Sequence, residues 1–135
     1  MTASRIASPL RGTVLGSSES DFMVAEWQDE GGIFDPPRMI APWHMHRSDD
    51  EAWYVLEGML CVRNGDEEVE LRPGCSVMVH RGTPHTYWNP GPAPARYLLI
   101  MTSRIYQLVQ EIHKTTDRTP DNMKALFRRY DSELL

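Results

Sequence analysis

Three histidines and one glutamate stand where they could hold a metal ion. His44 and His46 alternate along a short extended segment, and side chains two positions apart on a strand point to the same face. Glu51 follows the polar stretch 47–50, which is long enough to turn and return a carboxylate to the same ion. His85 lies in a later strand-like segment and is the fourth candidate ligand.

This donor set suits one divalent transition-metal ion per chain, because imidazole and carboxylate groups bind Fe, Mn, Co, Ni, Cu and Zn alike. Four protein ligands leave positions of an octahedral ion open for water, dioxygen or a substrate, as a catalytic metal requires. Cys61 and Cys75 form no CxxC pair and are expected to be reduced and buried. The sequence thus predicts an open metal site and leaves the identity of the ion undecided.

Short strands separated by glycine and proline must position these ligands. The Asn64-Gly65 pair is a strong signal for a hairpin turn. Many short strands without intervening helices favour an antiparallel sandwich or closed barrel, here over residues 1–102. The expected strands are 13–16, 22–28, 38–43, 52–56, 59–63, 68–71, 76–80, 85–88 and 96–101.

The segment 103–135 changes to a helical period and is expected to pack on the barrel within a single domain. Its apolar residues recur three and four positions apart in two groups, which Thr119-Pro120 separates with a helix-start signal. The groups are Ile105, Leu108, Val109 and Ile112, then Met123, Leu126, Phe127 and Tyr130. The two helices could dock on the outside of the barrel or cover one mouth and close a ligand cavity.

Two motifs resemble those of the cupin superfamily. The segment His44-x-His46-x4-Glu51-x6-Gly58 is similar to the first cupin motif, and Gly74-x5-His80-x-Gly82-x2-His85-x3-Asn89 is similar to the second. The resemblance spans roughly residues 13–101. It implies a mainly β fold, an antiparallel double-stranded β-helix or jelly-roll barrel, that holds the metal inside through His44, His46, Glu51 and His85. Arg38 and His80 stand where the motifs usually have glycine and proline.

Aromatic and methionine side chains flank the ligands and predict a mostly apolar pocket for a planar organic molecule. Trp53 shares the strand face of Glu51, and Tyr87 shares that of His85, so these two are the best candidates for the pocket wall. Tyr54, Met78 and Arg38 complete the predicted substrate-binding set. The predicted catalytic residues are Glu51, as ligand and proton acceptor, Tyr87, and His80, which could otherwise end its strand facing solvent.

Three functions fit these residues. The first is a mononuclear-metal oxygenase, dioxygenase-like, acting on a small apolar or aromatic molecule such as an enol or phenol. The second is a non-redox isomerase, lyase or cyclase, with Tyr54, His80 or Tyr87 as the base. The third is a non-catalytic barrel that binds or senses a small ligand. The sequence favours an enzyme, and the reaction class rests on analogy with the fold.

Charge and hydropathy exclude other classes. The 135 residues carry 14 basic and 19 acidic side chains, a net charge of −5 without a basic cluster, so a nucleic-acid partner is not expected. No apolar run approaches the roughly 20 residues of a membrane span, and residues 1–6 lack the apolar core of a signal peptide. We therefore expect a cytoplasmic protein. Trp43 and Trp88, expected to pack outside the barrel, suggest a homodimer.

Overall fold

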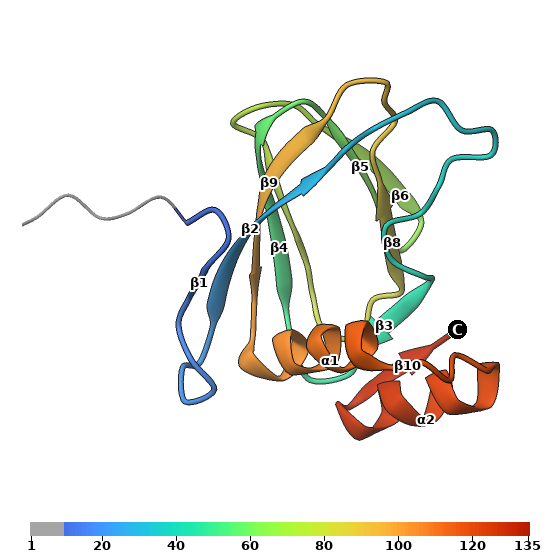
Figure 1. Cartoon of the computed structure of the whole chain (residues 1–135). Helices are drawn as coiled ribbons and strands as arrows, with labels where there is room; N and C mark the ends of the chain where they lie inside the picture. Colours follow the sequence, from blue (N-terminus) through green and yellow to red (C-terminus); the bar gives the residue numbers. More distant parts are fainter. Residues whose placement is uncertain (1–9) are drawn as a thin grey trace, which may run out of the picture.

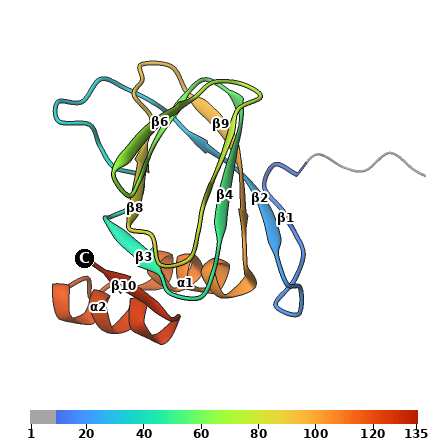
Figure 2. The ribbon, with the colours of Figure 1, turned by 180° about the vertical axis from the view of Figure 1, so that it is seen from behind.

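Two antiparallel sheets face each other in the computed structural model, which describes residues 10–135 (Figures 1 and 2). Within those residues each sheet has five strands, in the orders β1-β2-β9-β4-β7 and β10-β3-β8-β5-β6. Two helices, α1 (Ser103–Lys114) and α2 (Pro120–Arg129), separate β9 from β10. The strands are β1 (Val14–Leu15), β2 (Met23–Asp29), β3 (His44–His46), β4 (Glu51–Glu57), β5 (Leu60–Asn64), β6 (Glu67–Leu71), β7 (Ser76–Val79), β8 (His85–Trp88), β9 (Ala95–Met101) and β10 (Ser132–Leu134). The predicted mainly β barrel with a helical tail is confirmed.

Alternating apolar side chains of β9 and β4 build the core between the sheets. On β9, Tyr97, Leu99 and Met101 are buried, whereas the residues between them are only partly buried. On β4, Trp53 is buried on the same face as Glu51. Because neighbouring side chains of a strand point to opposite faces, packing Trp53 into the core also turns Glu51 inward. The core therefore sets the direction of a candidate ligand.

The observed strands follow the predicted ones closely, with one exception before the first ligand. Segment 38–43 forms only an isolated bridge between Met39 and Trp88, and the strand begins at His44 instead. Pro42 has no backbone N–H to donate, which prevents the ladder from extending through this position. The other predicted strands agree with the observed ones to within one residue at each end.

The tail forms both predicted helices and one strand that the sequence did not predict. Helix α1 begins after Thr102, whose hydroxyl accepts a hydrogen bond from the Ile105 amide at 3.3 Å. Helix α2 begins at Pro120, as the Thr119-Pro120 signal predicts. Beyond it, β10 pairs with β3, so the tail adds a strand to the sheet that carries two histidine ligands. Figures 1 and 2 both show α1 lying across one end of the barrel.

No helix in residues 10–135 is long and apolar enough to cross a membrane. Residues 1–6, on which the cytoplasmic prediction partly depends, lie outside the described part of the chain.

Gly58, between β4 and β5, should be intolerant of a side chain for two reasons. Its φ is +74°, and a Cβ there would meet the carbonyl oxygen of Pro94 and lie 2.8 Å from Cα of Ala95. Gly74 is the matched control, because its φ is +85° but a Cβ would meet nothing within 4 Å. We expect Gly74→Ala to cost about 1 kcal/mol and Gly58→Ala at least about twice as much, measured by urea unfolding. Equal costs would contradict the close packing of this turn against Pro94.

Candidate metal centre

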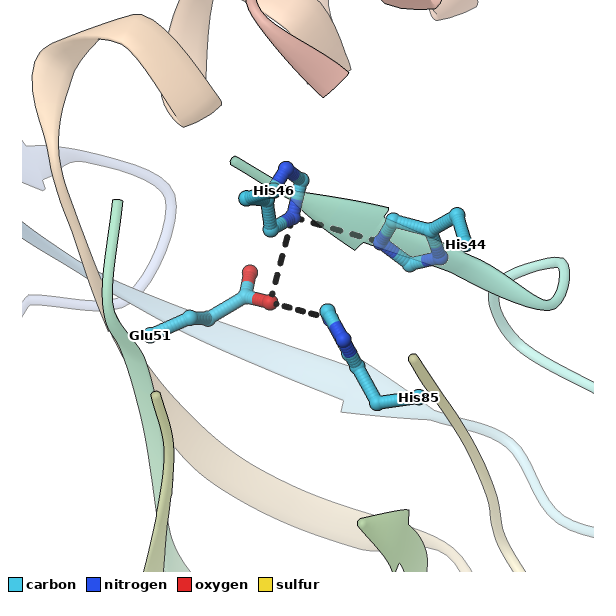
Figure 3. Close-up of side chains that lie close together, drawn as sticks. All are labelled: His44, His46, Glu51 and His85. Atoms are coloured by element: carbon cyan, nitrogen blue, oxygen red, sulfur yellow. Dashed lines mark hydrogen bonds and ion pairs between the residues drawn. The ribbon is translucent and has the colours of Figure 1, made fainter. Parts of the chain in front are cut away.

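The four predicted ligands converge between the two sheets (Figure 3). His44 and His46 lie on β3, His85 begins β8, and Glu51 begins β4 of the opposite sheet. His44 is paired with His85 in the β3–β8 ladder, which brings these imidazoles together. All four side chains are buried, and one donor atom from each lies within 4.8 Å of the others. Two separate sheets thus contribute to one buried cluster.

The donor atoms are spaced like neighbouring ligands of a single ion. Nε2 of His44 lies 3.2 Å from Nε2 of His46. Oε1 of Glu51 lies 3.0 Å from Nε2 of His85 and 3.5 Å from Nε2 of His46. Bonds of about 2.1 Å to adjacent positions of an octahedral ion would separate two donors by about 3.0 Å. The observed spacings are close to this value.

Each imidazole is oriented through its outer nitrogen, Nδ1. Nδ1 of His44 donates to the carbonyl of Pro42 at 2.6 Å, and Nδ1 of His85 donates to the carbonyl of Thr83 at 2.9 Å. Nδ1 of His46 lies 2.7 Å from Oγ of Ser132. The Ser132 hydroxyl donates to the carbonyl of Tyr130 at 3.1 Å, so it accepts from His46. The Nδ1 atom carries the hydrogen in all three rings, as in many histidine metal ligands.

The inner nitrogens of these rings therefore present lone pairs to one another when the imidazoles are neutral. The two Nε2 atoms of His44 and His46 face each other at 3.2 Å, and the Glu51 carboxylate adds a further acceptor. Acceptors brought together in a buried site repel one another unless a cation or added protons lie between them. The chemistry and spacing of this donor set fit a divalent transition metal.

Burial and local charges keep two of the ligands in the forms that bind metal. Burial, followed by the charges of His85 and His46, lowers the pKa of His44 to about 4, so its ring is neutral at pH 7. Burial alone would raise the pKa of Glu51, but when His46 and His85 carry a second proton, their hydrogen bonds and positive charge outweigh burial and hold that pKa below its ordinary range. Glu51 is therefore an ionised carboxylate, and His44 is available as a neutral donor.

A cavity of about 350 Å³ adjoins the cluster, and three of the four ligands, His44, His46 and Glu51, form part of its wall. Most of the rest is apolar or aromatic. Aromatic side chains come from both sheets and from α2, and the apolar side of α1 closes one end. The principal lining residues are Trp27, Trp53, Tyr87, Tyr97, Leu99, Ile105, Leu108, Val109, Ile112, His113 and Phe127.

The tail helices thus cover one mouth of the barrel instead of docking only on its outer surface. Ile105 and Leu108 of α1 are buried, and Leu108 packs with Leu126 and Phe127 of α2. The ring of Phe127 also lies 5.6 Å from that of His44, edge to face. Of the two placements open from the sequence, the structure has the one in which the tail helps to enclose a cavity.

Two of the predicted pocket residues line the cavity and two face away from it. Trp53 and Tyr87 form its wall and pack edge to face, with ring centroids 5.2 Å apart. Tyr54 and Met78 are exposed, at 38% and 50% of their full surface. Tyr54 has the opposite strand parity to Glu51, and Met78 is paired with Ala52, which also faces outward. Their nearness in sequence to the ligands misled the prediction.

His80 and Arg38 also lie outside the cavity wall. The side chain of His80 is 75% exposed, with Nδ1 4.0 Å from Asp50, which matches the alternative of a solvent-facing strand end. Arg38 lies 3.6 Å from a carboxylate oxygen of Asp29, with its guanidinium 4.5 Å above the ring of Phe34. The structure therefore does not bring either residue to the ligands.

The sequence prediction missed several residues of the cavity wall and one, Ser132, that contacts a ligand. Tyr97 could have been found, because it alternates with Leu99 and Met101 on a predicted strand. Trp27 lies on β2, a predicted strand, but far in sequence from both motifs. Ser132, Phe127 and His113 had no local signal as site residues, because their positions depend on how the tail folds back onto the barrel.

Loss of one imidazole should abolish stoichiometric metal binding without unfolding the barrel. We expect His44→Ala and His85→Ala to lose metal, because each removes one of four converging donors but leaves the apolar core intact. Elemental mass spectrometry measures metal per chain, and circular dichroism checks folding. His80→Ala is the matched control and should keep its metal. A full complement of metal in a folded His44→Ala or His85→Ala variant would contradict the ligand assignment.

Comparison with known proteins agrees with this geometry. The model of the cupin domain family matches residues 33–101, just over half of the chain. A curated relative, the tetracenomycin polyketide synthase protein TcmJ of Streptomyces glaucescens, is 42% identical over 53 residues. That match covers 39% of this chain and 36% of the relative. The chain therefore aligns with only about a third of the length of that relative.

Solved structures share the fold. A Klebsiella pneumoniae protein with a double-stranded β-helix domain superposes with a TM-score of 0.55 at 25% identity, covering 75% of this chain and 91% of that one. A sugar phosphate isomerase from Silicibacter pomeroyi superposes with a TM-score of 0.52 at 28% identity. The match covers 62% of this chain and 51% of that one. A cupin protein from Bacteroides fragilis superposes with a TM-score of 0.57 at 15% identity. The match covers 73% of this chain and 82% of that one. Two facing antiparallel sheets, a buried histidine–glutamate cluster and the family match together establish that this chain belongs to the cupin family.

Proposed function

We propose that this protein is a metal-dependent oxygenase that acts on a small, largely apolar aromatic or enolic molecule. The observation that carries the proposal is the position of the cavity, whose wall combines three metal-ligand side chains with a mostly aromatic and aliphatic surface. Its volume of about 350 Å³ is at the lower end for small-molecule sites. A substrate of one or two rings is the size that such a cavity admits.

The cavity wall favours an uncharged or weakly acidic ring system. Trp53, Tyr87 and Tyr97 form an edge-to-face series, with Tyr87 and Tyr97 centroids 5.8 Å apart. No lysine or arginine is among the residues that line the cavity in the described part of the chain. A phosphorylated substrate would therefore lack a cationic partner there, whereas a planar ring would pack against aromatic faces.

Two tyrosine hydroxyls supply hydrogen-bond donors in this apolar wall. The hydroxyl of Tyr87 lies 3.0 Å from that of Tyr97, and either can donate to the other. Burial raises the pKa of both phenols, so they stay protonated. Because one bond between two hydroxyls uses only one of their hydrogens, the second is available to a substrate oxygen. Tyr87 and Tyr97 thus act as donors to a carbonyl, enol or phenol oxygen and are poorly suited to act as bases.

Glu51 is the only acidic side chain among the cavity-lining residues of the described chain. Its contacts with His46 and His85 all use Oε1, which leaves Oε2 to accept a hydrogen bond from the hydroxyl of an enol or phenol. A redox-active divalent ion, when bound, supplies the electron transfer to dioxygen that oxygenation requires. The protein contributes orientation of the ring, a hydrogen-bond acceptor beside the ligands and an apolar wall from the tail helices.

The curated relative TcmJ supports an enolic substrate. TcmJ is a polyketide synthase protein, and polyketides are rich in the carbonyl and enol oxygens that neutral tyrosine hydroxyls and a carboxylate can bind. We therefore place polyketide-like phenols and enols first among the candidate substrates.

A second candidate is a non-redox cyclase or isomerase for the same class of molecule, which the polyketide synthase relative equally supports. This reaction needs a base separate from the metal. Of the bases predicted for it, Tyr54 and His80 lie outside the cavity, and Tyr87 is held neutral by burial. These positions are why we rank oxygenation above this alternative.

Oxygen consumption separates the two candidates. The iron-loaded protein should consume dioxygen when supplied with members of a panel of phenols, enols and diketones, as followed with an oxygen electrode. His85→Ala serves as the metal-deficient control and should be inactive. Conversion of the same compounds at an unchanged rate under anaerobic conditions would overturn the oxygenase and favour the non-redox reaction.

Removal of the Tyr97 hydroxyl should weaken substrate recognition. Tyr97→Phe deletes a buried donor without changing the ring, and we expect kcat/KM to fall about tenfold or more, since a hydrogen bond to a charged oxygen is worth roughly 1.5–3 kcal/mol. Tyr54→Phe makes the same chemical change on the outer face and should leave kcat/KM unchanged. Equal behaviour of the two variants would rule out the proposed donor role.

A further inference from the structure

The C-terminal strand is the principal backbone partner of the strand that carries two metal ligands. β3 pairs with β8 at a single position, His44 with His85. It pairs with β10 at all three of its positions, including Ser132 opposite His46. Two backbone hydrogen bonds extend this pairing at its ends. The Arg47 amide donates to the Asp131 carbonyl at 2.9 Å, and the Leu135 amide donates to the Trp43 carbonyl at 3.0 Å. The tail therefore secures β3 more extensively than the barrel does.

Ser132 makes a contact of a different kind from those around the other two histidines. His44 and His85 each donate to a carbonyl two residues earlier in the chain, in a local arrangement. His46 instead donates to the hydroxyl of Ser132, 86 residues away in the chain. Ser132 is 1% exposed, and its own hydrogen is directed to the carbonyl of Tyr130. This relay fixes both the hydroxyl and the tautomer of the His46 ring.

Ion pairs hold the same segment against the chain that leads from β3 to Glu51. Arg47 pairs with Glu133, and the Ser48 hydroxyl bonds to Asp131. Arg104 of α1 lies 2.9 Å from Asp49 and 3.7 Å from Asp131. Ser132 thus lies within a segment tied on both sides to residues next to metal ligands.

We propose that Ser132 is a positioning residue of the metal centre, and that the tail acts on metal binding through its hydrogen bond to His46. The bond holds Nδ1 protonated and directs Nε2 into the cluster, which strengthens the ring as a donor. The inference rests on occupation of the His44, His46, Glu51 and His85 cluster by a divalent ion. It does not depend on which reaction the protein catalyses.

Titration of the metal-free protein with Co²⁺ tests the proposal. Ser132→Ala retains the backbone pairing of β10 and removes only the hydroxyl, and we expect Co²⁺ affinity to fall 10- to 100-fold, the usual cost of losing such a partner. Ser132→Thr retains a hydroxyl, and Ser132→Val has the same shape without one. The Ser132→Thr variant should therefore bind Co²⁺ more tightly than the Ser132→Val variant. This comparison stands even if Ser132→Ala folds poorly. Glu133→Gln weakens tail docking away from His46 and should change Co²⁺ affinity little.

A spectroscopic readout separates positioning from general stability. In the Co²⁺ protein, three paramagnetically shifted, exchangeable imidazole N–H signals are expected in the proton NMR spectrum, one for each ligand histidine. Ser132→Ala should shift one of them or speed its exchange with water and leave the other two in place. Wild-type affinity and three unchanged signals in Ser132→Ala would overturn the proposal. Failure of the wild-type protein to bind Co²⁺ would instead overturn the metal centre itself, and the proposal with it.

Discussion

The central constraint on this site is that four acceptor atoms meet in a buried space. Three imidazole nitrogens and a carboxylate oxygen lie within 4.8 Å of one another, and their outer hydrogen bonds commit each ring to present a lone pair inward. A low-dielectric interior amplifies the repulsion among them and equally amplifies their attraction to a cation. Both sheets and the tail must therefore hold the ligands rigidly. The barrel provides this rigidity through a core that continues directly from the ligand faces of β4 and β8.

The parts of the site that could be predicted are those governed by local geometry. Alternation along a strand places His44 beside His46 and turns Trp53 with Glu51, and both follow from the sequence alone. Tyr54 and Met78 are near the ligands in sequence but have the opposite strand parity, and they face outward. Ser132 and Phe127 could not be predicted, because their positions depend on packing between segments more than 80 residues apart. The homodimer and the cytoplasmic location stay predictions.

The same helices contribute to stability and to selectivity. The apolar side of α1 completes the core through Ile105 and also closes the cavity through Val109 and Ile112. Its hydrophobic residues thus form part of the cavity wall and limit the size of the molecule that fits. A polar substitution on this side of α1 would change both the stability of the fold and the selectivity of the cavity. A substitution on the exposed face of the helix would change neither.

The pairing of β3 with β10 also imposes an order on assembly during synthesis. The ribosome makes His46 and then 85 further residues before it adds Ser132. Until then β3 can form at most its single pairing with β8, and only once His85 has been made, because β10 does not yet exist. The ligand strand is therefore completed late, and an ion captured by the nascent chain would bind a cluster in which His46 is still free to rotate. Metal loading in its final geometry follows the folding of the tail.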